Sequence, residues 1–240
     1  METTERKELF RVLTGSHNYN LNILNSDKDY KIFVCPTFND LYFNKEYSKN
    51  IIGETEDHLF FTIKKLTNLL FNSNIAFIEV LFCEELIIPD DISDKSKELL
   101  NKLFEMKNQI SRMNLSYLYD SCVGIYNQNI ASVKKDKVNY NYKKALQSVR
   151  ALDFIERFYN TEFSDFKQAI YYNNDDPTRQ LLLDIKNGKF SYEEIIELAE
   201  NKLEQTKKYK QIYKSHKIDN DTKDKLIEIV QSLVKDNLDL

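Results

Sequence analysis

The segment 13–36, LTGSHNYNLNILNSDKDYKIFVCP, constrains the fold more than any other part of the chain. It follows an apolar run and contains a pair of small residues, Gly15-Ser16. Ten residues later, the pattern Asp27-x-Asp29 leads into a second apolar run that ends at a proline. The segment therefore predicts a strand, a tight turn, a short helix or loop, and a second strand.

The two aspartates are placed to share a metal ion. Side chains at i and i+2 of a strand point to the same face, so Asp27 and Asp29 would lie side by side. Two divalent ions about 3.5–4 Å apart can stabilise both the attacking and the leaving oxygen of an in-line phosphoryl displacement. We predict that Asp27 and Asp29 are catalytic residues that bind Mg²⁺ or Mn²⁺, which favour carboxylates, water and substrate phosphates.

Glu79 is the candidate third carboxylate. It interrupts the apolar run 75–82, which the sequence predicts to be a buried strand beside the first two. A buried unpaired charge is costly, so Glu79 should have a cation partner. We predict that it completes the metal site as a third catalytic ligand; the alternative is a glutamate facing the edge of the sheet.

The residues after the first strand suit a phosphate group. Gly15 lets the backbone approach a triphosphate closely, and Ser16 offers N–H and hydroxyl donors. His17 follows directly and would either donate to phosphate or cap the turn. We predict that Gly15, Ser16 and His17 bind the triphosphate of an NTP substrate.

Two cations further along the chain could face the same substrate. Lys143 and Arg150 are seven residues apart, which places them two turns apart on one helical face. Such a face can bind triphosphate or nucleic-acid phosphate, and its alternative is a solvated face with stems packed on the core. Tyr140 and Tyr142 flank the start of this helix, where base stacking is also conceivable.

The pattern changes after Pro89-Asp90-Asp91, from mixed strands and helices to helices alone. Only 4 glycines and 3 prolines occur in 240 residues, which favours long helices over a loop-rich sandwich. The prediction is an α+β fold, with a small mixed-sheet nucleotidyltransferase domain over 1–90 and an α-helical domain over 91–240. Helices are expected over 54–71, 93–112, 114–134, 140–159, 178–187, 191–215 and 221–236.

Composition limits the cellular location and the binding partners that we expect for this chain. The formal net charge of −4 gives no global basic field that would attract nucleic acid. No stretch approaches 18 apolar residues, and the N-terminus is too charged for a signal peptide, so we expect no membrane partner. Cys35, Cys83 and Cys122 are widely spaced, which predicts buried thiols in a reducing cytoplasm rather than a disulfide framework or a zinc site.

The spacing G-S-x10-D-x-D followed by a third acidic segment resembles the minimal signature of the DNA polymerase β-like nucleotidyltransferase superfamily. The fuller strings at 15–21 and 26–30 resemble its RlaP/YcgL-type branch, predicted nucleotidyltransferases associated with RNA repair in bacteria and phages. Segments 72–82, 143–150 and 187–189 are similar to later motifs of that branch. The resemblance implies a small catalytic sheet domain followed by helices that help to bind nucleotide and acceptor. The chain departs from the pattern at Asn20, where a glycine is usual, and at Gln147, where a histidine is expected.

Three functions remain open from the sequence. The first is transfer of a nucleoside monophosphate from an NTP to an RNA end, in tRNA or RNA repair. The second is the same chemistry on a protein, as in small antitoxins that adenylylate a partner, and the long helical half argues against it. The third is a non-catalytic phage protein that binds a nucleotide or a host component, which the intact Asp27, Asp29 and Glu79 disfavour. The net acidic charge weakens the RNA hypothesis.

Overall fold

The structure is a computed structural model, and it describes residues 6–24 and 26–238. Its five-stranded sheet has the order β3-β4-β2-β1-β5. The strands β2 and β4 are parallel, and every other neighbouring pair is antiparallel. The strands are β1 (Glu8–Thr14), β2 (Lys28–Val34), β3 (Ser48–Ile52), β4 (Glu56–Thr62) and β5 (Leu86–Ile87). The chain therefore has the predicted α+β class, with a mixed sheet followed by helices.

The helices of the sheet half are short, and the longest helices of the described chain lie beyond residue 90. Those of the sheet half are α1 (Phe38–Tyr42), α2 (Ile63–Phe71), α3 (Ile75–Ile78) and the 3-10 helix η1 (Glu79–Phe82). Beyond it come α4 (Asp94–Glu105), α5 (Lys107–Arg112), α6 (Leu115–Val133), α7 (Tyr142–Asn160), α8 (Phe166–Ile170), α9 (Pro177–Lys186), α10 (Tyr192–Thr206), η2 (Lys207–Tyr209), α11 (Lys210–Ser215) and α12 (Asn220–Asn237).

Local signals explain several of these boundaries. Ser191 and Glu194 form the predicted capping box at the start of α10. After α9, Gly188 has a φ of +68°, the left-handed stop expected after a helix. The predicted helices over 114–134 and 221–236 are present as α6 and α12, with ends shifted by about one residue.

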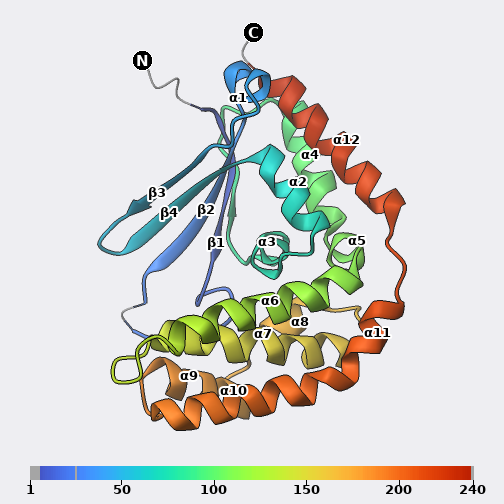
Figure 1. Ribbon diagram of the computed structural model, residues 1–240. Helices are drawn as coiled ribbons and strands as arrows, with labels where there is room; N and C mark the ends of the chain where they lie inside the picture. The colour runs from blue at the N-terminus through green and yellow to red at the C-terminus, as the bar shows by residue number, and fades with distance from the viewer. Residues whose placement is uncertain (1–5, 25, 239–240) are drawn as a thin grey trace.

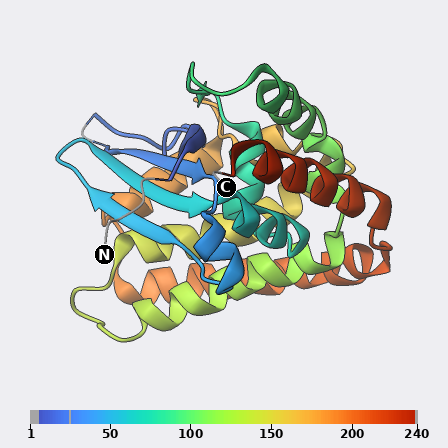
Figure 2. The same ribbon diagram turned by 90° about the horizontal axis from the view of Figure 1, so that it is seen from above.

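The helices form two groups around the sheet. Figure 1 shows α2, α4 and α12 on one side of the strands, and α6, α7, α9 and α10 across the end where β1 stops and β2 begins. In the view from above, α12 lies beside the strands, and helices of the second group pass beneath the sheet (Figure 2). One apolar core includes residues from both halves, among them Leu9, Leu66, Leu152 and Leu233. The domain boundary near residue 90 stays a prediction, and the core continues across it.

The prediction of one helix over 54–71 is wrong in its first half. Residues Glu56–Thr62 form β4, which pairs in parallel with β2, and the helix starts only at Ile63. The second half of the prediction is confirmed by α2, where Ile63, Leu66 and Leu70 are buried. The aromatic and β-branched content of EDHLFFT suits a strand.

The prediction of a strand over 75–82 is also wrong, because this run is helical. The side chain of Asn74 accepts a hydrogen bond from the backbone N–H of Ala76 and caps α3, and η1 continues from Glu79. A short apolar run that is buried all round has no periodicity that separates strand from helix. Two predicted helices are also interrupted: 93–112 breaks at Met106, and 191–215 breaks at η2.

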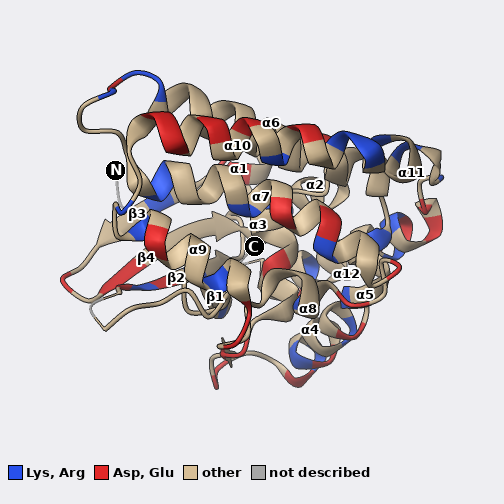
Figure 3. Cartoon of the chain, turned by 90° about the horizontal axis from the view of Figure 1, so that it is seen from below, with Lys and Arg blue, Asp and Glu red and all other residues tan. Residues whose placement is uncertain are grey.

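Charges of both signs are distributed over the surface. Seen from below, Lys and Arg are interspersed with Asp and Glu over the helices (Figure 3). Cys35 and Cys122 are buried, and Cys83 is half-buried. In the described part of the chain, no helix combines the length and the apolar character needed to cross a membrane.

Candidate functional site

The end of β1 and the start of β2 place the Gly15-Ser16 turn against Asp29. Thr14 pairs with Asp29 in the antiparallel ladder, and its hydroxyl donates to the Asp29 carbonyl at 3.0 Å. Gly15 has a φ of +71°, and a Cβ at this position would lie 2.2 Å from Asp29 Oδ2. Only glycine fits this turn, because another residue would be strained and would displace the carboxylate.

A third carboxylate lies on the strand beside β2. Asp57 of β4 is the direct register partner of Asp29 in the parallel ladder. Neighbouring strands are about 4.8 Å apart, so the two side chains leave the sheet close together. Burial raises the pKa of Asp29. The positive charges of Lys143 and Lys31 oppose this rise, and the negative charges of Asp57 and Asp27 add to it.

The Gly15-Ser16 turn, Asp27 and Asp29 border a pocket of about 520 Å³ between the sheet and the helices, whereas Asp57 lies outside its lining. Its lining joins the turn and the β2 entrance to the first turns of α7 and the last turn of α9. The lining residues are Gly15, Ser16, Tyr19, Leu21, Ile23, Ser26, Asp27, Asp29, Tyr140, Asn141, Tyr142, Lys143, Leu146, Gln147 and Lys186. One part of the lining is charged and the rest is mostly aromatic and aliphatic, which suits a ligand with an anionic and an apolar portion.

Two lysines face the aspartates across this pocket. Lys143 comes from α7, and Lys186 from the last turn of α9. Lys186 Nζ donates to the Leu21 carbonyl at 2.9 Å and to Ser26 Oγ at 3.0 Å. Burial lowers the pKa of Lys186, as does the neighbouring Lys143, whereas Asp29 and Asp27 oppose this shift. We call Asp27, Asp29, Lys143 and Lys186 the pocket cluster.

The helical half holds the loop that follows the turn. Asn20 has a φ of +59°, so this asparagine takes the left-handed conformation at the position where the sequence pattern has a glycine. Arg179 Nε donates to the Asn20 carbonyl at 2.8 Å, and Asn20 Nδ2 donates to the Tyr172 carbonyl at 2.8 Å. Lys167 Nζ donates to Asn18 Oδ1 at 3.0 Å. Residues beyond 160 thus fix a loop that begins at residue 15.

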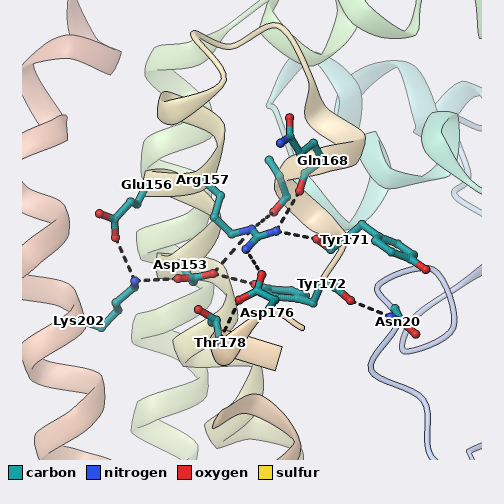
Figure 4. Close-up of polar contacts among 11 residues, drawn as sticks. Asn20, Asp153, Glu156, Arg157, Gln168, Tyr171, Tyr172, Asp176, Thr178 and Lys202 are labelled. Carbon is teal, nitrogen blue, oxygen red and sulfur yellow. Dashed lines mark hydrogen bonds and ion pairs between the residues drawn. The ribbon is translucent and has the colours of Figure 1, made fainter. Parts of the chain in front are cut away.

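The anchor at Tyr172 belongs to a larger polar network (Figure 4). The Tyr172 hydroxyl donates to the buried Asp153 at 3.1 Å, and Lys202 Nζ donates to the other oxygen of Asp153 at 2.7 Å. Arg157 donates to Asp176 at 2.6 Å and to the Tyr171 carbonyl at 2.6 Å. This network joins α7, α9 and α10 to the loop, so the pocket wall has a rigid support.

Glu79 lies outside the pocket, in the packed layer behind Tyr19. It is 2% exposed, and its carboxylate accepts from Lys31 Nζ at 2.8 Å and from the Tyr19 hydroxyl. The expected cation partner exists, and it is a lysine from β2. Burial raises the pKa of Glu79 and lowers that of Lys31. A carboxylate that is enclosed and bonded in this way holds the turn in place rather than facing a substrate.

Arg150 and His17 also lie away from the pocket lining. Arg150 is 4% exposed; its guanidinium carbon lies 3.8 Å from the centroid of the Tyr19 ring, and it donates twice to Gln147 Oε1. His17 Nε2 is 3.3 Å from the Ser26 carbonyl, so the imidazole bridges the two ends of the loop. Of the two cations predicted on one helical face, Lys143 reaches the pocket and Arg150 packs behind it. We call Lys31, Glu79 and Arg150 the buried cluster.

The carboxylates present suit a magnesium ion bound together with substrate phosphate. In the described residues, no three Asp, Glu, His or Cys side chains converge closely enough to form a complete metal cage. Mg²⁺ seldom needs such a cage, because it keeps several waters and uses one or two carboxylates plus substrate phosphates. Asp27 and Asp29, which line the same pocket, are a donor pair of that kind.

The sequence analysis does not identify Lys186, which lines the pocket, or Asp57, which lies beside Asp29 on the next strand. The helix expected over 54–71 contains Asp57, and a helix there would not pair Asp57 with Asp29. A strand assignment for EDHLFFT would have revealed its position beside Asp29. Lys186 had only a weak signal, as a lysine in the last turn of a helix that stops at Asn187-Gly188.

No protein-family pattern and no curated protein matches this chain. A solved structure to which it is similar is described as a nucleotidyltransferase-like protein from Exiguobacterium sibiricum 255-15. The sequences are 14% identical and the TM-score is 0.34, over 96% of this chain and 75% of that one. At this identity and TM-score the likeness assigns no residue roles, so the roles proposed below rest on the geometry of this chain and on its motifs.

Proposed function

We propose that this chain is a metal-dependent nucleotidyltransferase that transfers a nucleoside monophosphate from an NTP to a hydroxyl acceptor. The observation that carries the proposal is the convergence of the pocket cluster and the Gly15-Ser16 turn in one pocket. Two carboxylates, two lysines and a close-approach glycine are the groups that a triphosphate and its metal ions require.

Each group has a role in this scheme. Mg²⁺, when bound, supplies positive charge for the oxygens on which negative charge develops. Asp27 and Asp29 would hold it, and Asp57 is positioned to add a carboxylate beside Asp29. Lys143 and Lys186 would neutralise the phosphates that leave as pyrophosphate. The Gly15-Ser16 turn would donate hydrogen bonds to the same phosphates.

For the acceptor we propose an RNA end, on the resemblance of the motifs at 15–30 to the RNA-repair-associated branch. The helical half supports a large acceptor, because the 19-residue helix α7 starts at the pocket and runs on beside α6 (Figure 1). The surface charge is mixed and the net charge is −4, so RNA would be held by local contacts near the pocket rather than by a global field.

Labelling distinguishes these functions. The protein is incubated with each α-³²P-labelled NTP and Mg²⁺, together with either total tRNA or the proteins of a cell lysate. The expected result is label on RNA, which disappears in the Asp27→Asn/Asp29→Asn variant while the circular dichroism spectrum is unchanged. Label on protein alone would assign the same chemistry to a protein acceptor. Nucleotide binding without any labelled product would contradict the catalytic proposal.

A further inference from the structure

The apolar part of the pocket contains one tyrosine with surface left open for a ligand. Three tyrosines line the pocket: Tyr19, Tyr140 and Tyr142. Tyr19 is 3% exposed and Tyr140 is 6% exposed, whereas Tyr142 is 43% exposed. Tyr19 is already covered by the Arg150 guanidinium, and the Tyr140 hydroxyl donates to the Phe190 carbonyl at 2.7 Å. Tyr142 is therefore the aromatic ring of this pocket that is still available.

The ring of Tyr142 is held in place from two directions. A Cβ on Gly188 would lie 2.6 Å from Cε2 and 2.7 Å from Cζ of Tyr142, so the glycine backbone is in direct contact with the ring. Tyr140 packs against it edge to face, with ring centroids 4.8 Å apart. A side chain fixed before a ligand arrives loses little entropy on binding.

In the sequence, Tyr142 is adjacent to a residue of the charged part of the pocket. Tyr142 is the first residue of α7, and the next residue, Lys143, lines the same pocket as Asp29. If the phosphates of a nucleotide lie between Asp29 and Lys143, its base and ribose contact the apolar lining. Aromatic rings bind any base through its π face.

We propose that Tyr142, held by Gly188, is the stacking platform for the nucleobase of the NTP. This inference rests on the proposed function, and it adds that the site selects a nucleotide over a bare triphosphate by stacking. Since stacking needs only a π face, the site would accept all four bases and bind the larger purines more tightly.

The test compares two ligands that share the phosphates and differ in the base. ATP and inorganic triphosphate are titrated into the wild type, Tyr142→Phe and Tyr142→Leu, with Mg²⁺, by calorimetry. Tyr142→Leu should weaken ATP binding roughly 5- to 100-fold and leave triphosphate binding unchanged, whereas Tyr142→Phe should bind both ligands normally. The matched control is Tyr117→Leu, because Tyr117 is 47% exposed and stands on α6 against Phe71.

A second variant reports stacking directly. The chain contains no tryptophan, so Tyr142→Trp introduces a single indole. ATP should quench its fluorescence saturably and triphosphate should not, while Tyr117→Trp should respond to neither ligand. Gly188→Ala should also weaken ATP binding, because the added methyl group requires the ring to move.

The outcomes separate this inference from the proposed function. ATP binding that is equal in wild type and Tyr142→Leu, with no quenching of the indole, would overturn the role of Tyr142 and leave nucleotidyl transfer intact. A wild-type protein that binds neither ATP nor triphosphate would overturn both. A Tyr142→Leu variant that loses ATP and triphosphate binding equally would show that the ring supports the phosphate site and not the base.

Discussion

The pocket cluster and the buried cluster both combine acidic and basic side chains, and Tyr19 links them, because it lines the pocket and contacts Glu79 and Arg150. In the pocket cluster, Asp27 is exposed and Asp29 is half-buried, and both border a cavity. In the buried cluster, Glu79 is 2% exposed and both of its oxygens accept hydrogen bonds from protein groups. A carboxylate can bind a metal ion and a substrate only where protein donors do not already occupy its oxygens and where a ligand can reach them. The surroundings, rather than the residue type, therefore separate the two clusters.

The same comparison explains why Glu79 resembled a metal ligand. A glutamate in an apolar run must have a cation, and both Mg²⁺ and a lysine satisfy that requirement. Here Lys31, two residues beyond Asp29 on β2, supplies it. Asp57 instead stands beside Asp29, on the strand that was assigned to a helix.

The largest expected effect is on Asp29, the centre of the pocket cluster. Asp29→Asn keeps the shape of the side chain and removes its charge, so the transfer rate should fall by about 10³-fold or more, equivalent to about 4 kcal/mol. The measurement is labelled-product formation at saturating NTP and Mg²⁺, with the thermal midpoint as the check on folding. Wild-type transfer by this variant would remove Asp29 from the catalytic machinery.

Glu79→Gln should act on stability instead. It leaves Lys31 buried without an anion, which costs about 3–5 kcal/mol of unfolding free energy, measured by urea denaturation. Transfer per folded molecule should persist below the transition. The matched control is Glu84→Gln, which breaks the exposed pair of Glu84 with Lys167 and should cost less than about 1 kcal/mol. If Glu79→Gln abolished transfer at unchanged stability, Glu79 would belong to the metal site after all.

Asp57→Asn tests the carboxylate that the register of β2 and β4 places beside Asp29. The transfer rate should fall about 100-fold, equivalent to about 2.7 kcal/mol, and rising Mg²⁺ concentration should restore part of it. Its control is Glu56→Gln on the same strand, because adjacent side chains point to opposite faces. Equal activity of the two variants would leave Asp57 without a catalytic role.

The smallest expected effect concerns the hydroxyl of Tyr19, which joins the loop after β1 to Glu79 of the buried cluster. Tyr19→Phe removes the donor to Glu79 and leaves the ring that stacks on Arg150, so the unfolding free energy should fall by about 1 kcal/mol. Tyr117→Phe on α6 should change it by less than about 0.5 kcal/mol. A larger loss for Tyr19→Phe than for Glu79→Gln would mean that the ion pair is not what orders this cluster.

The sequence by itself determined the parts of this protein that depend on local physics. The strand, turn and strand of 13–36 follow from a glycine that must take positive φ and from apolar runs that end at defined residues. The long helices follow from periodicity and caps, as at Ser191. The neighbourhood of Asp29 and the Gly15-Ser16 turn also follows, because strands that are consecutive in the chain usually lie beside each other.

Tertiary structure alone decided which distant side chains share a site. Strand β4 forms because it pairs with β2, and that pairing places Asp57 opposite Asp29. Burial decided that Glu79 meets Lys31, and helix packing brought Lys186 and Tyr142 into the pocket. Such contacts depend on the relative placement of whole elements, which no local pattern encodes.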